Sequence, residues 1–319
     1  MQVTYRLPDC ENHILLTFVN ISDSLGICNS GRTDLNQPNH LMTILSFTLI
    51  LLCGAFSAGL LGSLTGLGGG VVIIPLLTLV FHVDIRYAIG TALVASIATS
   101  SGSASAYVKE GITNIRLGMF LEIATTTGAV VGALIAVYMP TNVVAIIFGL
   151  VLIFSSLMSF RKKMEVPVGE QKSKLAAQLR LNSSYPTTEG VVNYEVHHVP
   201  GGYFMMTFAG VMSGLLGIGS GALKVLAMDN IMRIPFKVST TTSNFMIGVT
   251  AAASAVVYLQ RGYIAPGLCM PVVLGVLAGA FAGSKLLSRA NVKWLRIVFS
   301  VVIGGLALQM IYNGITGKL

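Results

Sequence analysis

Charged side chains are scarce in this chain. Asp, Glu, Lys and Arg make up 10% of its 319 residues, whereas 54% are hydrophobic. A soluble domain contains roughly 25% charged residues, so the composition excludes an ordinary soluble domain and indicates a polytopic membrane protein. The net charge of +8 is therefore no sign of nucleic-acid binding, and no nucleic-acid partner is expected.

The sequence also lacks the usual marks of catalysis. All of its histidines lie outside the apolar segments: His13, His40, His82, His197 and His198. An intramembrane serine enzyme would thus have no base, and Ile218 breaks the G-x-S-x-G pattern around Ser220. There is no CxxC, no His-rich cluster and no G-x-x-x-x-G-K-[ST]. We predict neither enzyme activity nor a cofactor or metal, and any transport would be gradient-driven or passive.

The four cysteines are dispersed. Cys53 and Cys269 fall inside apolar segments, where a cysteine serves as a small packing residue. Cys10 and Cys28 lie in the N-terminal region, and a disulfide between them is an option if that region is extracytoplasmic.

The apolar segments form two groups of five, with a polar stretch between them. The first group comprises 41–64, 70–81, 87–108, 116–139 and 143–160. The second comprises 203–217, 222–232, 238–259, 266–287 and 292–312. The halves align without a gap at an offset of 151 residues, so that Gly70 meets Gly221, Thr99 meets Thr250 and Tyr107 meets Tyr258. Because one ungapped alignment holds through all five segments, the sequence predicts an internal duplication.

Glycine-rich runs at 62–70 and 213–221 interrupt both halves. In lipid, a broken helix is tolerated only where it is packed in protein or lines a cavity. Two matched breaks are a pointer to a transport site. The alternative is that glycines only let helices pack closely, and this is our interpretation of the pairs Gly128/Gly132 and Gly279/Gly283.

Five segments per half is an odd number, so the second repeat should be inverted relative to the first. Lys and Arg residues concentrate on the inside if both termini lie outside. We predict an all-α polytopic plasma-membrane protein of two inverted five-segment repeats, with glycine-broken or re-entrant helices. Its parts would be an extracytoplasmic region 1–40, a first repeat 41–160, a cytoplasmic linker 161–201 and a second repeat 202–319. Segments 203–217 and 222–232 would extend about 22 Å and 16 Å at 1.5 Å per residue, short of a ~30 Å core.

Lys224 lies three residues after Gly221, near the start of a helix whose unpaired N–H groups favour anions. An intramembrane lysine is costly and usually functional. It could neutralise a bound anion, pair with Asp229, or extend to water. Asp229 and Glu122 are acids at membrane depth that could carry a coupling proton, although Glu122 could also simply reach the interface.

The run Thr240 to Asn244 offers neutral hydrogen-bond donors, which in membrane helices also bond commonly to the carbonyl four residues earlier. The predicted substrate site consists of Gly66, Gly68, Gly69, Gly70, Gly217, Gly219, Ser220, Gly221, Lys224, Thr241, Ser243 and Asn244.

The glycine run 62–70, the following Val71-Val72-Ile73-Ile74-Pro75 and the second run 214–221 resemble the TauE/SafE sulfite-exporter family. The resemblance covers about residues 41–317. It implies a carrier or permease that moves a small sulfur-containing anion, such as sulfite, a sulfonate or sulfoacetate, across the cytoplasmic membrane. On this reading the partners are that anion, membrane lipid and, as one option, protons. Alternating access would come from rocking of the two repeats. The alternatives are an anion channel with the glycine breaks as its filter and an intramembrane enzyme, against which the missing motifs argue.

Overall fold

The computed structural model describes residues 38–65, 68–109, 111–160, 174–187, 190–287 and 292–316. Residues 47–319 form one compact unit, and residues 1–46 form another, whose described part is the start of helix α2. Cys10, Cys28, Gly66 and the linker residues 161–173 lie outside the described residues. The predictions that concern them stay predictions.

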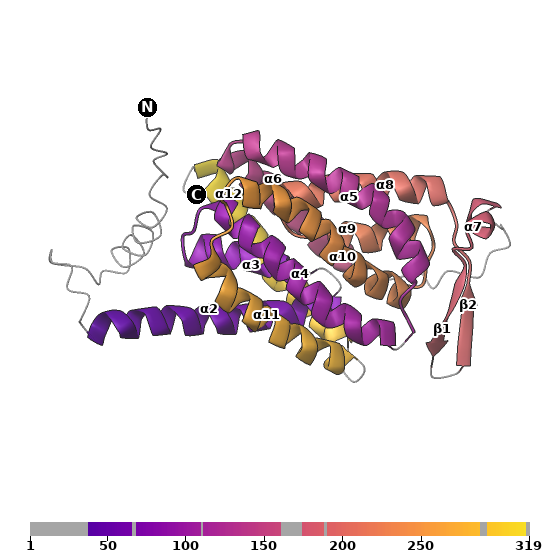
Figure 1. Ribbon diagram of the computed structural model, residues 1–319, viewed down its shortest axis with the longest axis horizontal. Helices are drawn as coiled ribbons and strands as arrows, with labels where there is room; N and C mark the ends of the chain where they lie inside the picture. The colour runs from indigo at the N-terminus through magenta and orange to yellow at the C-terminus, as the bar shows by residue number, and fades with distance from the viewer. Residues whose placement is uncertain are drawn as a thin grey trace, which may run out of the picture. The chain divides into compact units, whose positions relative to one another are not determined.

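Helices account for nearly all of the described chain (Figure 1). The first half contains α2 (Pro38–Thr65), α3 (Gly70–Pro75), the π-helical turn η1 (Leu76–Val80), α4 (Ile85–Lys109), α5 (Ile115–Tyr138) and α6 (Thr141–Phe160). The second contains α8 (Val199–Leu216), α9 (Gly221–Leu226), the π-helical turn η2 (Ala227–Ile231), α10 (Phe236–Gln260), α11 (Pro266–Leu287) and α12 (Val292–Thr316). Every predicted apolar segment coincides with one of these helices, or with an α–π pair, to within four residues at either end. The helical prediction is thus confirmed.

Element bounds recur at the spacing of the sequence alignment. Helices α3 and α9 begin at Gly70 and Gly221, 151 residues apart, and the same spacing separates the starts of η1 and η2 and both ends of α4 and α10. Pro75 ends α3, whereas Leu226 ends α9. The widened π turn therefore forms with or without a proline before it.

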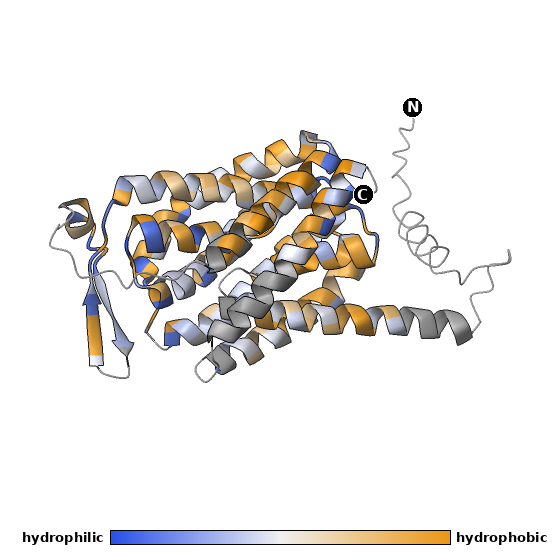
Figure 2. Cartoon of the chain, turned by 180° about the vertical axis from the view of Figure 1, so that it is seen from behind, coloured by the Kyte–Doolittle hydropathy of each residue, from blue (hydrophilic) through white to orange (hydrophobic). Residues whose placement is uncertain are grey.

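Five described helices are long and apolar enough to cross a membrane, judged by length and composition: 46–63, 115–138, 199–216, 236–260 and 266–285. Helix segments 70–80 and 141–154 are apolar but shorter. Figure 2 shows hydrophobic residues dominating the helices, with hydrophilic residues mainly at helix ends and in connections.

Glycines bring helices from the two halves into close contact. Helix α5 packs against α8, α6 against α12, and α4 against both α10 and α11. A Cβ on Gly132 would collide with the backbone carbonyl of Val211, and one on Gly279 with that of Phe56. These glycines therefore act in helix packing, as the sequence interpretation held.

Gly132→Ala is expected to lower stability by about 1–3 kcal/mol, the usual cost of overpacking a core, because the colliding atom is backbone and cannot turn away. Thermal unfolding in detergent measures the effect. Gly305→Ala is the matched control, since Gly305 lies in α12 with open space around its Cα, and alanine there should be neutral or slightly stabilising. Equal melting temperatures for the two variants would contradict the packing role.

The predicted polar linker contains folded structure. The short helix α7 (Lys174–Gln178) is followed by the antiparallel strands β1 (Ser183–Thr187) and β2 (Gly190–Tyr194). Figure 1 shows these elements together beside the start of α8. The hairpin corrects the all-α prediction. Its β-branched and aromatic residues favour strands, but they were not recognised as strands because they stand among polar residues.

Asn114 joins this hairpin to the helical core. Its Oδ1 accepts a hydrogen bond from the Leu117 N–H at 3.0 Å and so caps α5. Its Nδ2 donates to the Leu181 carbonyl at 2.9 Å and to the Tyr194 hydroxyl at 2.8 Å. Burial raises the pKa of Tyr194 above its ordinary value, so this hydroxyl stays protonated at neutral pH.

Candidate functional site

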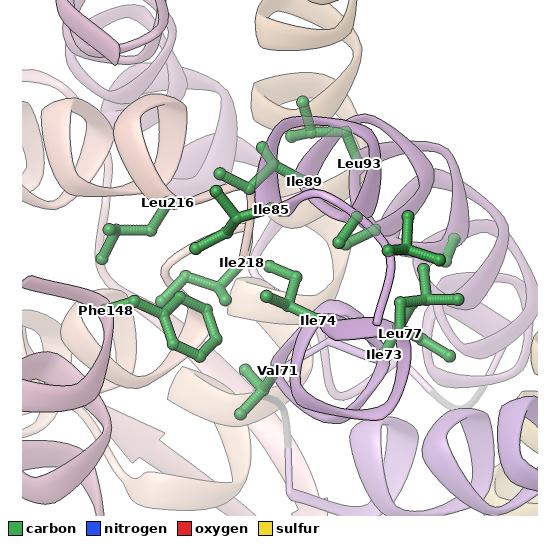
Figure 3. Close-up of a cluster of buried hydrophobic side chains, with 14 of the residues drawn as sticks. Val71, Ile73, Ile74, Leu77, Ile85, Ile89, Leu93, Phe148, Leu216 and Ile218 are labelled. Carbon is green, nitrogen blue, oxygen red and sulfur yellow. The ribbon is translucent and has the colours of Figure 1, made fainter. Parts of the chain in front are cut away.

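The non-helical segments after α2 and α8 meet although they are distant in sequence. A Cβ on Gly70 would lie 3.0 Å from the Gly217 carbonyl oxygen, and Gly68 and Gly219 both face the side chain of Ile247. Figure 3 shows Ile218, from the second segment, beside the apolar cluster that surrounds α3. The structure thus brings predicted glycines of both runs to one place.

The backbone of the second segment is held in the left-handed region. Gly217 and Gly219 have φ of +68° and +67°, which glycine adopts without penalty. Ser220, which precedes α9, has φ of +45°, a conformation that costs a non-glycine residue of order 1–3 kcal/mol. Strain of this kind at a buried serine is a feature of binding sites.

Two tyrosines hold the helix ends that lead into these segments. The Tyr107 hydroxyl donates to the Ser63 carbonyl at 3.1 Å, and the Tyr258 hydroxyl lies 3.4 Å from the Gly214 carbonyl. Both tyrosines are almost fully buried. Each bond spans 44 residues, and each satisfies a carbonyl that the helix end would otherwise leave unpaired.

Several buried polar atoms at this place have no hydrogen-bond partner among the described residues, including Ser96 Oγ, Ser220 Oγ and Asn244 Oδ1. Ser96 Oγ would lie 2.7 Å from a Cβ on Gly70, so it sits where the two segments meet. An unsatisfied buried polar group costs about 1–3 kcal/mol, and native proteins keep few of them. Such groups in and next to the two segments favour a small polar ligand here.

The donors predicted in α10 are largely engaged within the protein. The Thr241 hydroxyl donates to the Lys237 carbonyl at 3.0 Å, the ordinary arrangement for a membrane helix. Ser243 Oγ donates to the Gly221 carbonyl at 3.3 Å, and Asn244 Nδ2 donates to the Ser63 carbonyl at 3.3 Å. Ser243 and Asn244 therefore hold the two segments in place in this conformation.

Lys224 is fully buried, and its partner lies on another helix. Its Nζ donates to Thr250 Oγ1 at 2.5 Å, and Thr250 Oγ1 lies 2.6 Å from Glu122 Oε1. The threonine hydroxyl therefore bridges a cation on α9 and a carboxylate on α5. Of the three N–H groups of the ammonium, only the one on Thr250 has a hydrogen bond within the described part of the chain.

Glu122 is only 8% exposed. Its Oε1 also accepts from the Thr126 hydroxyl at 3.1 Å. Its Oε2 is buried and has no hydrogen-bond partner among the residues that the structure describes. The structure therefore buries this acid among the helices of the protein.

The remaining predicted residues are divided between two places. Gly69 faces the Thr99 hydroxyl, close to the meeting point of the segments. Asp229 lies in η2 and is half-buried. Over the described ranges, His, Cys, Asp and Glu side chains nowhere gather in threes as a metal site would require.

Two residues of this arrangement were missed by sequence reasoning: Ser96 and Thr250. Thr250 had a signal, because the alignment of the halves pairs it with Thr99. Ser96 pairs with Ile247 at the same offset, so the repeat gave no reason to select it.

Curated relatives of the chain are described as probable membrane transporter proteins. YunE of Bacillus subtilis (strain 168) is 28% identical over 278 residues, covering 85% of this chain and 99% of its own. YdhB of the same strain is 24% identical over 74% of this chain and 89% of its own. A protein of Xylella fastidiosa (strain 9a5c) is 24% identical over 85% of this chain and 97% of its own.

No solved structure gives a significant match. The model of one protein family, described as sulfite exporter TauE/SafE, matches residues 50–310, which contain both glycine runs, Lys224 and Glu122. Together with the apolar helices, these relatives make the chain a membrane protein of a transporter family. The chain belongs to the sulfite exporter TauE/SafE family.

Proposed function

We propose that this protein is a secondary carrier that moves a small sulfur-containing anion, such as sulfite, a sulfonate or sulfoacetate, across the cytoplasmic membrane. The observation that carries the proposal is the meeting of the two glycine segments beside the buried Ser96 hydroxyl, which has no partner among the described residues. The buried Lys224 follows one turn into α9, the helix that begins at Gly221. An anion there would accept hydrogen bonds from Ser96 and Ser220 and from the two N–H groups of Lys224 that make no hydrogen bond to the described residues. Charge-assisted hydrogen bonds of this kind are about twice as strong as neutral ones.

Alternating access is proposed to arise from two inverted repeats, with the glycine segments inside the membrane and both termini extracytoplasmic. The matched element bounds support a repeat. So do exchanged contacts: α5 meets α8 through Gly132 and Val211, while α11 meets α2 through Gly283 and Leu60 at the same offset. An exchange of partners is what a two-fold relation between halves produces. Five segments in each half would then make the repeats antiparallel in the membrane.

Flux in liposomes tests the carrier. Purified protein would be reconstituted, and uptake of labelled sulfite, methanesulfonate, sulfoacetate and acetate measured. Saturable uptake of the sulfur anions, accelerated by the same anion on the far side, is expected of a carrier. Unitary conductance that is linear in concentration would favour the channel alternative, in which the same segments act as a filter. Absence of flux for all of the sulfur anions would overturn the proposed function.

Ser220→Gly is expected to raise the KM for the transported anion by roughly tenfold or more, because a charge-assisted hydrogen bond worth about 1.5–3 kcal/mol is lost. Glycine keeps the left-handed backbone at this position and removes the hydroxyl together with the Cβ that carries it. Ser57→Ala is the control, since the Ser57 hydroxyl is exposed and donates to the Cys53 carbonyl. A KM that is unchanged in Ser220→Gly would remove this serine from the site.

A further inference from the structure

Glu122, Thr250 and Lys224 form a charge-compensated bridge between the two halves of the chain. Glu122 belongs to α5, and the other two belong to α10 and α9. Lys224 is 0% exposed and Glu122 is 8% exposed. An isolated buried charge is strongly unfavourable, whereas a paired one is tolerated. Any event that gives Lys224 a different counter-charge therefore leaves the Glu122 carboxylate without the positive charge that compensates it.

We propose that Glu122 binds a proton when an anion binds at Lys224, so that the carrier moves one proton together with each anion. The inference rests on the proposed function and assigns its coupling ion. Without substrate, Lys224 and Glu122 neutralise each other across Thr250. A bound anion adds a second negative charge to this interior, and uptake of one proton by the carboxylate restores neutrality.

The geometry assigns the proton to one oxygen. Glu122 Oε1 accepts hydrogen bonds from Thr126 and Thr250. Oε2 is buried and has no partner among the described residues. Protonation at Oε2 leaves the bonds to Oε1 in place, while Lys224 turns its remaining N–H groups to the anion. On release of the anion, Lys224 becomes the counter-charge again and the proton leaves.

The titratable groups around Glu122 are few. On its own helix these are Arg116 at the start and Tyr138 at the end. Helix α8 contributes Tyr203, whose ring lies 5.4 Å from that of Phe120. Helix α10 contributes Lys237 in its first turn and Tyr258 near its end, and Asp229 lies in η2. The cation joined to Glu122 by a bridging hydroxyl is Lys224.

Proteoliposomes containing a pH-sensitive dye distinguish this coupling from simple anion flux. The probe is labelled sulfite or methanesulfonate, whichever the wild-type protein accumulates. An acidic exterior should increase wild-type accumulation several-fold and bring about one proton into the lumen per anion. Glu122→Gln mimics the protonated acid, so this variant should still exchange labelled for unlabelled anion. It should neither respond to the pH gradient nor move protons.

Asp84→Asn is the matched control and should keep wild-type coupling, because Asp84 is exposed and its Oδ1 accepts a hydrogen bond from the Arg86 N–H, which asparagine can also accept. Protonation of sulfite itself is the same for every variant, so a difference between variants reports the contribution of the protein to proton movement. Gradient-driven accumulation by Glu122→Gln would overturn the inference, as would anion transport by the wild-type protein without proton movement. Because the wild-type stoichiometry is measured independently, the inference remains testable even if the Gln variant folds poorly. Loss of coupling with intact anion exchange leaves the proposed function standing, whereas absence of all anion flux removes it.

Discussion

Lys224→Met is expected to reduce anion transport by at least about a hundredfold. Methionine approximates the length of the buried side chain but provides neither charge nor a hydrogen-bond donor. Removing one member of a buried charge pair costs about 3–5 kcal/mol, and here the loss falls on Glu122, which keeps its carboxylate without the bridged cation. Initial rates of anion uptake and the melting temperature of the purified protein measure the two effects.

A double variant separates the two contributions. Lys224→Met combined with Glu122→Gln leaves no net charge in the interior, so stability should return toward the wild-type value while anion uptake stays absent. Such non-additivity is expected for residues in one network. Lys237→Met, at an exposed lysine of α10, should leave uptake unchanged. Wild-type anion affinity in Lys224→Met would exclude this lysine from the site.

Gly217→Ala is expected to abolish transport and to lower stability by several kcal/mol, because two penalties coincide. The residue has φ of +68°, which costs a non-glycine residue about 1–2 kcal/mol. A Cβ there would also lie 2.5 Å from the Ile89 side chain and 3.1 Å from the Ile89 carbonyl oxygen. The second segment would have to move away from α4, and the meeting point with Gly70 would be lost.

Gly111→Ala provides the comparison for this substitution. Gly111 has the same φ of +68°, but nothing lies within 4 Å of its Cβ position. It should therefore show the backbone penalty alone, with transport retained. Melting temperatures and uptake rates of both variants test the point. If the two alanines behave alike, close packing of the glycine segments is not what positions the site.

The helices were predictable from sequence because their cause is local. Long apolar runs have to satisfy their backbone hydrogen bonds internally, and glycine runs interrupt them regardless of distant neighbours. The place of Lys224 next to Gly221 was visible for the same reason. The helices therefore followed from hydropathy and spacing, with errors of a few residues at their ends.

The partners of the site residues were not predictable in this way. The sequence interpretation considered Asp229 as a partner for Lys224 because it is close in the chain, whereas the described hydrogen bond joins Lys224 to Thr250 and continues to Glu122. Contacts between helices depend on how the helices are rotated, and hydropathy that is similar all around a helix does not specify a rotation. The hairpin was missed because its short strands lie in a segment with strongly polar flanks.

The hairpin region makes hydrogen bonds to both halves of the chain. Asn114, which caps the start of α5, donates to Leu181 and Tyr194, while the backbone N–H of His197 donates to the Met232 carbonyl at 3.1 Å, next to η2. In a carrier whose halves rock, these hydrogen bonds would hold the two halves together at one end; we call this set of bonds the clasp. Opening at that end has to break or stretch these bonds, and opening at the other does not. The clasp would then set the resting balance between the two access states, and the balance could be shifted from the linker without touching the transport site.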